Sequence, residues 1–555
     1  MTTKQKLLFV AVLGLALFFR FFLVGQMPGG LFPDEAANGL DIVSMQRGDL
    51  QPFYERGNGR EALFFYMQWA SVEAFGKGAW QHHIVSAFVG FLATVVTFFL
   101  TRRLVLLADD KKDENRATWI ALLAMFLMAV SSWHVVLSRT AFRANLIPLF
   151  ATLTFYLLIV TAQAKTLKTR LLFAALTGAS FALGFYTYIA YRILVPVLGL
   201  VVLWPMLVDL FIRPRFEGVK KFFAPTLVAG AAFVAFIAPI AYYFYTHAGS
   251  FVGRSGQVSV FNPELNGGDL FGTMAEVFRL SMKAYFWSGD LNWRHNISGE
   301  PFLSVIISPF FAIGLAMATY FAARYLFNPS RFKNKWVYFL VAGWFWSMIL
   351  PVITTAEGIP HGLRAIGTIP PVFILAAFGI YAIKERAQAI VSPYMMQVDA
   401  WKQKLVRNAV KVMYVVFFLA LISQTYFLYF VYAANSPENF YAFRSDLTVV
   451  SNYLKESGDK NNTYLILDKF SIQTVEYITT NDANNPNDPK NQPYIQVDPE
   501  DSWKLTGLKP GDRLVFTQSS IFDIRKFKQY HPNAKLFRED RNKFNQTVMA
   551  IYVIQ

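Results

Sequence analysis

The chain contains no cysteine among its 555 residues. This absence excludes disulfide bonds, thiolate metal sites and cysteine nucleophiles, although it does not identify the compartment in which the protein works. Charged residues are also scarce, at 16% against 54% hydrophobic residues, and the mean hydropathy is +0.34. A chain of this composition is too apolar to be a soluble multidomain protein.

The apolar residues are gathered in long blocks. Each block is about 20 residues long, which is the length that a helix needs to cross the hydrocarbon core of a membrane. Several blocks contain proline, which helix bundles in membranes tolerate. No small-x-small cleavage site follows the first block, so a membrane helix is favoured there over a signal peptide. The sequence therefore predicts an all-α polytopic membrane protein with about 11 transmembrane helices. The blocks cover about 6–24, 83–101, 117–133, 145–163, 171–187, 193–212, 222–245, 303–323, 337–354, 367–383 and 409–433.

Lysine and arginine are concentrated at the N-terminus and in every second loop after it. The first alternate loop, 25–82, has more acids than bases. Because cytoplasmic loops of membrane proteins are the basic ones, we expect a cytoplasmic N-terminus in a plasma (inner) membrane. An odd number of spans then places the C-terminus outside. The net charge of +16 reflects this bias and argues little for a nucleic-acid partner.

The predicted topology divides the chain into two domains. Residues 1–433 form the transmembrane domain, with two long outer loops at 25–82 and 246–302. Residues 434–555 read as a small extracytoplasmic α/β domain. Its expected strands are TYLILD, PYIQVD, RLVFTQ and VMAIYVI, its expected helices are LTVVSNYLKES, SIQTVEYI and IFDIRKFKQY, and NDANNPNDPKNQ is an expected loop.

Two adjacent acids, Asp34 and Glu35, follow the first apolar block in the stretch FPDEAANGL. One interpretation makes Asp34 the N-cap of a helix that begins at AANGLDIV. The other makes it a reactive acid, and the two are compatible because a cap fixes the geometry of its neighbour. Farther along the same loop, Arg60 and Glu61 directly precede the apolar run LFFYMQWA.

Basic residues recur on the predicted outer face, which the positive-inside rule should deplete. Arg139 and Arg143 are four residues apart, so a helix would place them on one face. Arg192 has apolar and aromatic neighbours, and an ionisable residue at that depth is a functional candidate. Taken singly, each is more often structural, for example by snorkelling toward headgroups. Together they suit a cavity that holds a lipid phosphate beside Asp34, since arginine binds phosphate in a bidentate manner. The other members of this outer set are Arg60, Arg294, His295, His361 and Arg364, with Asp290 and Asn296 close in sequence.

Six segments together resemble the GT-C glycosyltransferases. The resemblance is strongest to the prokaryotic branch of glycosyltransferase family 39, the dolichyl-phosphate-mannose–protein mannosyltransferase-like proteins, which are similar to the lipid A aminoarabinose transferases. It covers roughly 1–430 and leaves out the terminal domain. The segments are PDEAANGL, GREALFFYM, SRTAFRANLIPLFATLTFYLL, GFYTYIAYRILVP, NWRHNISGEP and PHGLRAIGTIPP.

The resemblance implies that a sugar moves, with inversion, from a polyprenyl-phosphate monosaccharide to an acceptor outside the cytoplasm. Asp34 would be the general base, with Glu35 the less certain member of the pair. Arg60 matches a lysine that contacts phosphate in the aminoarabinose transferases. The residues expected to bind the lipid phosphate or the sugar are Arg60, Glu61, Arg143, Arg192, Asp290, Arg294, His295, His361 and Arg364.

The sequence departs from these relatives in three places. Arg143 and Asn145 stand where the aminoarabinose transferases carry a further acid, so no second catalytic acid is expected there. The 246–302 loop is too short for the β-trefoil insert of the eukaryotic enzymes, and no WWD-like signature points to an oligosaccharyltransferase. No cofactor or metal is expected to be required, although a divalent cation could use Asp290 if it approached the acid pair.

A transporter or lipid flippase is the alternative function. Such proteins place charges near the membrane midplane, often in paired halves. Here the charged candidates gather at one face, which favours the transferase. The sugar, the polyprenol, the acceptor (protein, lipid or glycan) and the oligomeric state are left open.

Overall fold

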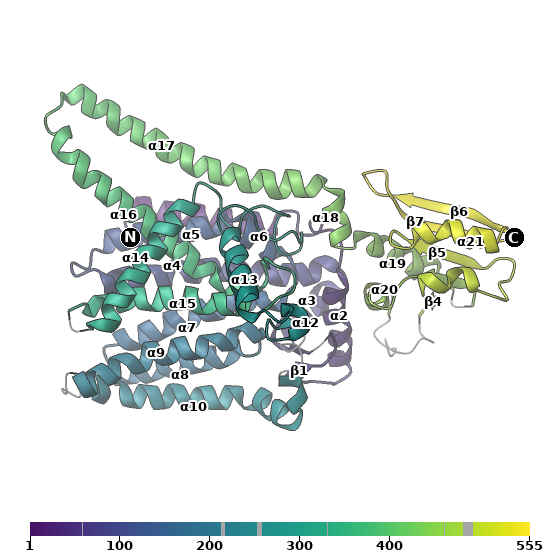
Figure 1. Ribbon diagram of the computed structural model, residues 1–555, viewed down its shortest axis with the longest axis horizontal. Coiled ribbons are helices and arrows are strands. Elements are labelled where there is room, and N and C mark those ends of the chain that lie inside the picture. The colour runs from purple at the N-terminus through teal and green to yellow at the C-terminus, as the bar shows by residue number, and fades with distance from the viewer. Residues whose placement is uncertain (58, 213–216, 252–257, 330, 460, 481–491) are drawn as a thin grey trace. The chain divides into compact units, whose positions relative to one another are not determined.

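The computed structural model describes residues 1–57, 59–212, 217–251, 258–329, 331–459, 461–480 and 492–555. Contacts divide the chain into two compact units (Figure 1). Unit 1 comprises Met1–Phe22 and Ser86–Tyr432, and unit 2 comprises Leu23–Val85 and Ala433–Gln555. The first outer loop thus belongs to the same unit as residues 434–555. The expected loop NDANNPNDPKNQ lies, except for its last residue, outside the described residues.

Unit 1 is built from helices. The α-helices are α1 (Thr3–Phe21), α4 (Ala79–Ala108, whose first residues belong to unit 2), α5 (Glu114–Ala129), α6 (Ser132–Arg139), α7 (Leu146–Gln163), α8 (Leu167–Gly184), α9 (Leu194–Leu207), α10 (Glu217–Thr246), α12 (Pro263–Asn266), α13 (Leu270–Ala284), α14 (Ser308–Phe327), α15 (Trp336–Ile353), α16 (Ile369–Met395) and α17 (Ala400–Tyr426). Short 3-10 or π turns are η1 (Arg143–Asn145), η2 (Ile189–Ile193), η3 (Val208–Ile212), η4 (Lys333–Lys335), η5 (Arg364–Thr368) and η6 (Phe427–Tyr432).

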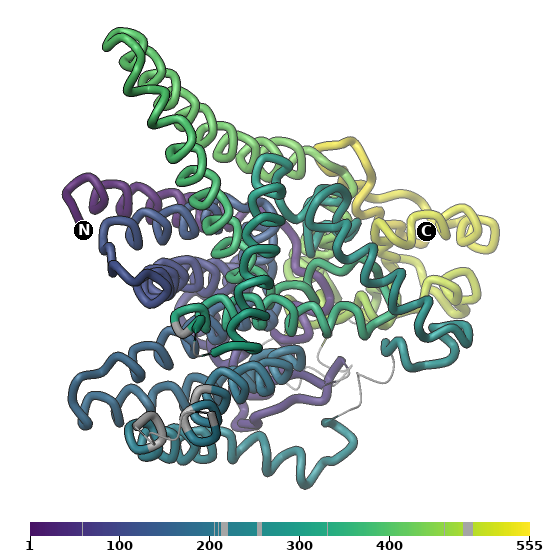
Figure 2. The backbone as a smooth tube through the Cα atoms, turned by 60° about the vertical axis from the view of Figure 1, so that its left-hand side comes forward, coloured from purple at the N-terminus to yellow at the C-terminus, as the bar shows by residue number. Residues whose placement is uncertain are grey.

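These helices pack as a bundle. Helix α8 packs between α7 and α10, and these blue helices run alongside one another in Figures 1 and 2. Helix α14 packs against α15 and α16, and α5 packs against α1 and α16. Large apolar side chains such as Phe19, Trp344 and Phe155 are fully buried within unit 1.

Each of the eleven predicted apolar blocks overlaps a helix, and the polytopic helical class is confirmed. In the described part of the chain, seven helices are long and apolar enough to cross a membrane. The count becomes eight when α5 and α6, bent by 60° at their break, are taken as one span. The bend falls where Ser131 accepts a hydrogen bond from the backbone N–H of His134 (3.2 Å) and starts a new helix. Eleven spans therefore stay a prediction.

Unit 2 combines the first outer loop with an α/β domain. The loop contains α2 (Pro33–Gln46), β1 (Phe53–Tyr54), β2 (Arg60–Glu61) and α3 (Leu63–Phe75). The remainder contains α18 (Pro437–Ala442), α19 (Ser445–Ser457), β3 (Thr463–Ile466), α20 (Ile472–Thr479), β4 (Ile495–Val497), β5 (Arg513–Thr517), α21 (Ile524–Tyr530), β6 (Ala534–Arg541) and β7 (Thr547–Ile554), with short turns η7 (Ala433–Asn435), η9 (Pro499–Lys504) and η10 (Ile521–Asp523).

The five strands of the α/β domain form one sheet in the order β4-β3-β5-β7-β6. Strand β3 is parallel to β4 and β5, whereas β7 is antiparallel to β5 and β6. All four predicted strands and all three predicted helices are confirmed. The sequence did not reveal β6, because its segment AKLFREDR is mostly exposed and charged. Such an edge strand has no buried face to produce an apolar pattern, and its charges discourage pairing with other chains.

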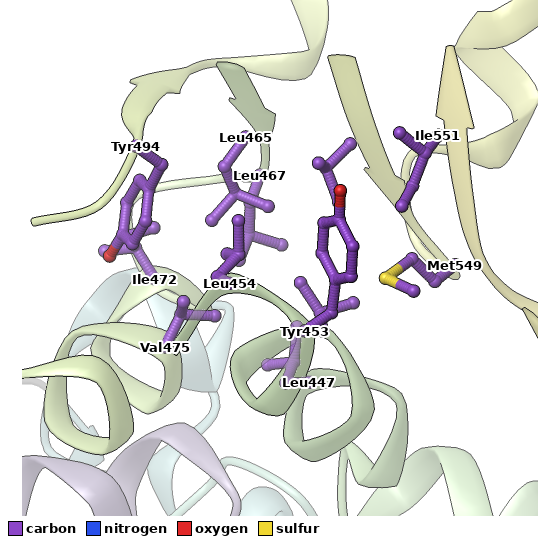
Figure 3. Packing of buried hydrophobic residues seen from close by; sticks show 12 residues of the cluster. Leu447, Tyr453, Leu454, Leu465, Leu467, Ile472, Val475, Tyr494, Met549 and Ile551 are labelled. Carbon is purple, nitrogen blue, oxygen red and sulfur yellow. The ribbon is translucent and has the colours of Figure 1, made fainter. Parts of the chain in front are cut away.

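Side chains alternate between the two faces of this sheet, and helices cover both faces. On one face Leu465, Val515 and Ile551 pack against Leu454 of α19 and Val475 of α20 (Figure 3). On the other face Ile466, Leu514 and Phe516 pack against Phe527 of α21. The sheet is therefore a rigid support for the segments attached to it.

Candidate functional site

The predicted site residues fall in both units, and each group is described within its own unit. Unit 2 holds Asp34, Glu35, Arg60 and Glu61; unit 1 holds Arg143, Arg192, Asp290, Arg294, His295, His361 and Arg364.

Helix α2 begins at Pro33, so Asp34 and Glu35 lie in its first turn. Proline suits this position because its missing N–H would have no partner inside the helix. The residue at the N-cap is Phe32, whose N–H donates to Oε2 of Glu35 at 3.0 Å. The prediction that Asp34 is the N-cap was therefore wrong: the helix starts one residue before it, and Glu35 provides the cap.

The two acids have opposite surroundings. The Glu35 side chain is fully buried, and its Oε2 lies 3.4 Å from Nε2 of His83. Asp34 is exposed, and its carboxylate forms no hydrogen bond or ion pair with any residue that the structure describes. Asp34 is thus the member of the pair that a ligand can reach.

Arg60 is buried beneath α2 and is bonded to it. Its guanidinium donates to Oδ2 of Asp41 and to Oδ1 of Asn38, at 2.6 Å each, and to the backbone carbonyl of Asp34 at 3.4 Å. Asp41 also pairs with Arg56 at 2.9 Å. Burial raises the pKa of the Asp41 carboxyl, and the two guanidiniums act in the opposite direction. These contacts fix the helix that presents Asp34.

Asn38, Asp41 and His83 were not predicted from the sequence. A signal for the first two was available: positions 34, 38 and 41 follow the i, i+4, i+7 spacing of one helical face. Glu61 is buried next to Arg60 and pairs with Phe53 in the short sheet of β1 and β2. No local pattern points to His83, which lies 48 residues from Glu35.

Helix α20 of the α/β domain packs on α2 through Tyr477. This buried ring shares a cluster with Leu31, Ala36, Leu40 and Val43. Its hydroxyl lies 2.9 Å from Nε2 of His82, and Thr474 donates to the carbonyl of Leu31 at 3.0 Å. The segment that carries Asp34 is therefore part of the same packed unit as the C-terminal sheet.

In unit 1, Asp290 joins two loops. Its Oδ2 accepts from the backbone N–H of Gly362 at 2.8 Å and lies 3.0 Å from Nδ1 of His295, while its Oδ1 accepts from the N–H of Asn292 at 2.8 Å. The rings of His295 and His361 stack with centroids 4.5 Å apart. Burial lowers the pKa of His295, which Asp290 opposes. The structure thus brings His361 next to Asp290 and His295, which lie far from it in sequence.

These three residues could also hold a metal ion. Each offers one ligand atom, and the three atoms lie within 4.8 Å of one another. A carboxylate and two imidazoles suit zinc. The same carboxylate already receives two backbone N–H groups, so its position does not depend on an ion.

The four arginines of unit 1 that were predicted as site residues differ in their surroundings. The backbone N–H of Arg364 donates to Nδ1 of His361 at 3.4 Å, and its guanidinium donates to Thr355 at 3.0 Å. Arg294 accepts at its carbonyl from the Thr140 hydroxyl at 3.2 Å. Arg364 is therefore linked to His361, and Arg294 belongs to the same loop as Asp290 and His295.

Arg143 and Arg192 face aromatic rings instead. The guanidinium of Arg143 lies 5.2 Å from the ring centroid of Tyr188, and that of Arg192 lies 4.4 Å from Phe251. Such cation–π contacts lower the cost of placing a charge in apolar surroundings.

Arg139, which was grouped with the outer bases, is fully buried at a helix end. It donates to the carbonyls of Phe19 and Arg20 in the last turn of α1, and to the Tyr429 hydroxyl. Arg20 in turn donates to the carbonyls of Met128 and Ala129 at the end of α5. Cations are stabilised at helix C-termini, which gives both residues a structural role.

No protein-family model and no curated protein matches the chain. Two of the solved structures that it resembles are informative. The crystal structure of ArnT from Cupriavidus metallidurans bound to undecaprenyl phosphate has a TM-score of 0.51 and 13% identity, over 99% of this chain and 98% of that one. The archaeal oligosaccharyltransferase AglB from Archaeoglobus fulgidus, in complex with an inhibitory peptide and a dolichol-phosphate, has a TM-score of 0.52 and 11% identity, over 100% of this chain and 74% of that one.

The match to ArnT extends into residues 434–555, which the motif resemblance had left out. ArnT and AglB are both members of the GT-C superfamily. At these identities the likeness concerns the fold, and it agrees with the motifs found in the sequence: the chain is a polytopic membrane protein with the fold of the GT-C glycosyltransferases.

Proposed function

We propose that the protein is a membrane glycosyltransferase that moves a sugar from a polyprenyl-phosphate monosaccharide to an acceptor outside the cytoplasm. Two glycosyltransferases with this fold support the proposal, one bound to undecaprenyl phosphate and one in complex with a dolichol-phosphate and a peptide. A panel assay identifies whether the acceptor is a protein, a lipid or a glycan.

The observation that carries the proposal is the exposed carboxylate of Asp34 next to the buried Glu35, which caps the helix. A hydroxyl is a poor nucleophile, and a positioned carboxylate that takes its proton in the transition state lowers the barrier. The Asp34 side chain is accessible for this task, and its backbone is held by the hydrogen bond from the Arg60 guanidinium to its carbonyl. Asp34 is therefore the proposed general base, and Glu35 supports it by capping the helix.

In the proposed reaction the acceptor hydroxyl displaces the polyprenyl phosphate from the sugar. The acceptor oxygen forms a bond to the anomeric carbon while its proton passes to Asp34. The bond from that carbon to the phosphate oxygen breaks, and its electron pair leaves with the polyprenyl phosphate. Attack from the face opposite the leaving group inverts the configuration.

Cationic groups stabilise the departing phosphate in this proposal, so no leaving-group acid is required. Arg294, His361 and Arg364 are the first choice in unit 1, because they lie at or beside the loops that Asp290 joins. Arg143, Arg192 and His295 are the further proposed contacts. Arg60 keeps its proposed phosphate contact, and its bonds to Asp41 and Asn38 give it a second role in fixing α2.

We also propose that no metal or cofactor is obligatory, because cationic side chains meet the charge of the leaving group. The distribution of lysine and arginine supports a cytoplasmic N-terminus in a plasma membrane and an outer α/β domain.

A panel assay tests the function. Purified protein is offered polyprenyl-phosphate sugars together with peptide, lipid A-type and glycan acceptors, and release of free polyprenyl phosphate is followed. We expect release that depends on one acceptor class and is absent in Asp34→Asn. Acceptor-independent release, or no release with any donor of the panel, would contradict the proposal.

A further inference from the structure

Helix α13 lies in the connection between two candidate membrane spans. Helix α10 ends at Thr246 and α14 begins at Ser308, and both qualify as spans. A connection between consecutive antiparallel spans emerges at one membrane face. Helix α13 packs on α15 and runs across the direction of that helix rather than along it (Figure 1). The helix thus lies in the connection at one end of two candidate spans, with its axis across that of α15.

Three faces of α13 differ in character. One face, with Val277, Ser281 and Ala284, is buried in the protein. The second is apolar but exposed, and the exposed fraction reaches 82% for Phe271 and 39% for Phe278. The third face carries charges. At 100° per residue, the exposed apolar positions 271, 275 and 278 and the half-buried position 282 lie between the buried face and the charged face. The charged positions are Glu276, Arg279 and Lys283.

An open groove of about 530 Å³ lies along the boundary of the apolar and charged faces. Two cations and four large apolar groups line it together. Its lining is Phe278, Arg279, Met282, Lys283, Phe286 and Trp287. The exposed pair Glu276–Arg279, at 2.6 Å, partly neutralises Arg279 and leaves a net positive charge at Lys283.

We propose that α13 lies in the plane of the membrane interface and that its groove binds an anionic phospholipid. The phosphate lies between Arg279 and Lys283, and an acyl chain lies along Phe278, Phe286 and Trp287. The inference concerns α13 alone and does not depend on sugar transfer. It adds a lipid site to residues that no motif had singled out.

Two arguments favour a lipid as the occupant. Large aromatic side chains exposed to water carry a high hydrophobic cost, whereas the acyl region of a membrane interface accommodates them. A cation beside an apolar groove complements a phosphate attached to a chain, and basic residues near a membrane surface attract anionic lipids. Exposed Trp287 fits the same interface, where tryptophan is enriched.

The cysteine-free chain permits a direct test of depth, because any introduced cysteine is the only one. Full-length Phe278→Cys and Glu276→Cys are spin-labelled in nanodiscs, with Val277→Cys as a buried control. We expect collisions with oxygen to dominate at position 278 and collisions with a water-soluble nickel chelate to dominate at 276. Equal nickel accessibility at 276 and 278 would overturn the interfacial placement.

Native mass spectrometry tests the headgroup. Full-length protein is titrated with phosphatidylglycerol and, separately, with phosphatidylcholine. Replacing both cations, Arg279→Gln with Lys283→Gln, should weaken phosphatidylglycerol binding by about five-fold for each cation removed and leave phosphatidylcholine unchanged. Lys402→Gln with Lys404→Gln, two lysines of α17, is the matched control. Unchanged phosphatidylglycerol binding in the α13 variant, or an equal loss in the α17 control, would overturn the site. A loss of binding that affects only polyprenyl phosphate, and neither of the two phospholipids, would also overturn the proposed site.

Discussion

The ring of Tyr477 lies directly against Gly39, so that a β-carbon at position 39 would stand only 2.5 Å from its Cε2. Gly39 lies on α2, five residues after Asp34, and Tyr477 lies on α20 of the α/β domain. The close approach of these two helices requires a residue without a side chain. The C-terminal sheet therefore takes part in holding the helix that carries the proposed base.

Gly39→Ala should destabilise unit 2. In an open helical position this change would stabilise by about 0.5–1 kcal/mol, but here the added methyl overlaps the Tyr477 ring and costs about 1–3 kcal/mol. Thermal unfolding in detergent measures the difference. Gly230→Ala on α10, where a β-carbon would meet nothing within 4 Å, is the matched control. Equal melting temperatures for the two variants would contradict the contact.

Asp34→Asn and Glu35→Gln should separate catalysis from stability. Asp34 is exposed, so its variant should keep the melting temperature of the parent and lose sugar transfer. Glu35 is buried against His83, so its variant should lose about 1–3 kcal/mol of folding stability. Turnover and unfolding are measured on the same preparations. Near-normal turnover in Asp34→Asn would remove it as the base.

Arg60 and Asp41 should behave as a coupled pair. Removing Asp41 takes its carboxylate away from the buried Arg60 guanidinium, which costs about 3–5 kcal/mol. Removing Arg60 should cost less, because Asp41 keeps its pair with Arg56. Arg60→Met with Asp41→Leu should cost less than the sum of the two single variants. The KM for the donor distinguishes the proposed phosphate contact of Arg60 from its role in fixing α2. We expect Arg60→Gln to raise it and Asp41→Asn to leave it near the parent value. Equal changes in both variants would restrict Arg60 to fixing α2.

Glu476 on α20 should make stability depend on pH. Burial raises its pKa, with Arg56 acting in the opposite direction. The folded state then keeps the proton to a higher pH than the unfolded chain does. This contribution is complete below the ordinary pKa of about 4.3 and is lost as the pH rises through the folded-state value.

Glu476→Gln cannot ionise, so it should raise the melting temperature relative to the parent at about pH 7.5 and have little effect at about pH 4. Glu456→Gln, at an exposed position of α19, is the control. A larger stabilisation at the acidic pH would reverse the sign and refute the assignment.

Removal of metal should leave turnover unchanged. Prolonged dialysis against a chelator is followed by the donor-release assay and by metal analysis. The informative contrary result is a loss of activity that a divalent ion restores in the parent but not in His361→Ala. It would identify Asp290, His295 and His361 as a required metal site.

Much of the fold was readable from the chain because the signals are local. Twenty-residue apolar blocks must become helices in a membrane, since hydrocarbon offers their backbone groups no other partner. Strands such as RLVFTQ were equally clear, because buried strands must be apolar. Strand β6 escaped notice because neither of its faces is extensively buried.

The site was predictable only in part. The sequence pointed to Asp34 and to most of the charged residues near it, because charges are rare in so apolar a chain. It placed the helix start at Ala36, whereas α2 begins at Pro33, and so assigned the cap to Asp34 instead of Glu35. It also grouped Arg139 with phosphate ligands, although this guanidinium is held by backbone carbonyls of α1.

The sequence by itself determined the class of protein, the positions of its long apolar helices and of four strands of the α/β domain, and the acidic turn after the first apolar block. Composition and period suffice for these, since each depends on residues within one or two turns. Only the tertiary structure decided which acid is buried, which guanidinium is bound by carboxylate and amide oxygens, and that Tyr477 packs on Gly39. Those outcomes depend on desolvation and close contact between residues that are tens to hundreds of positions apart, for which a single sequence carries no local signal.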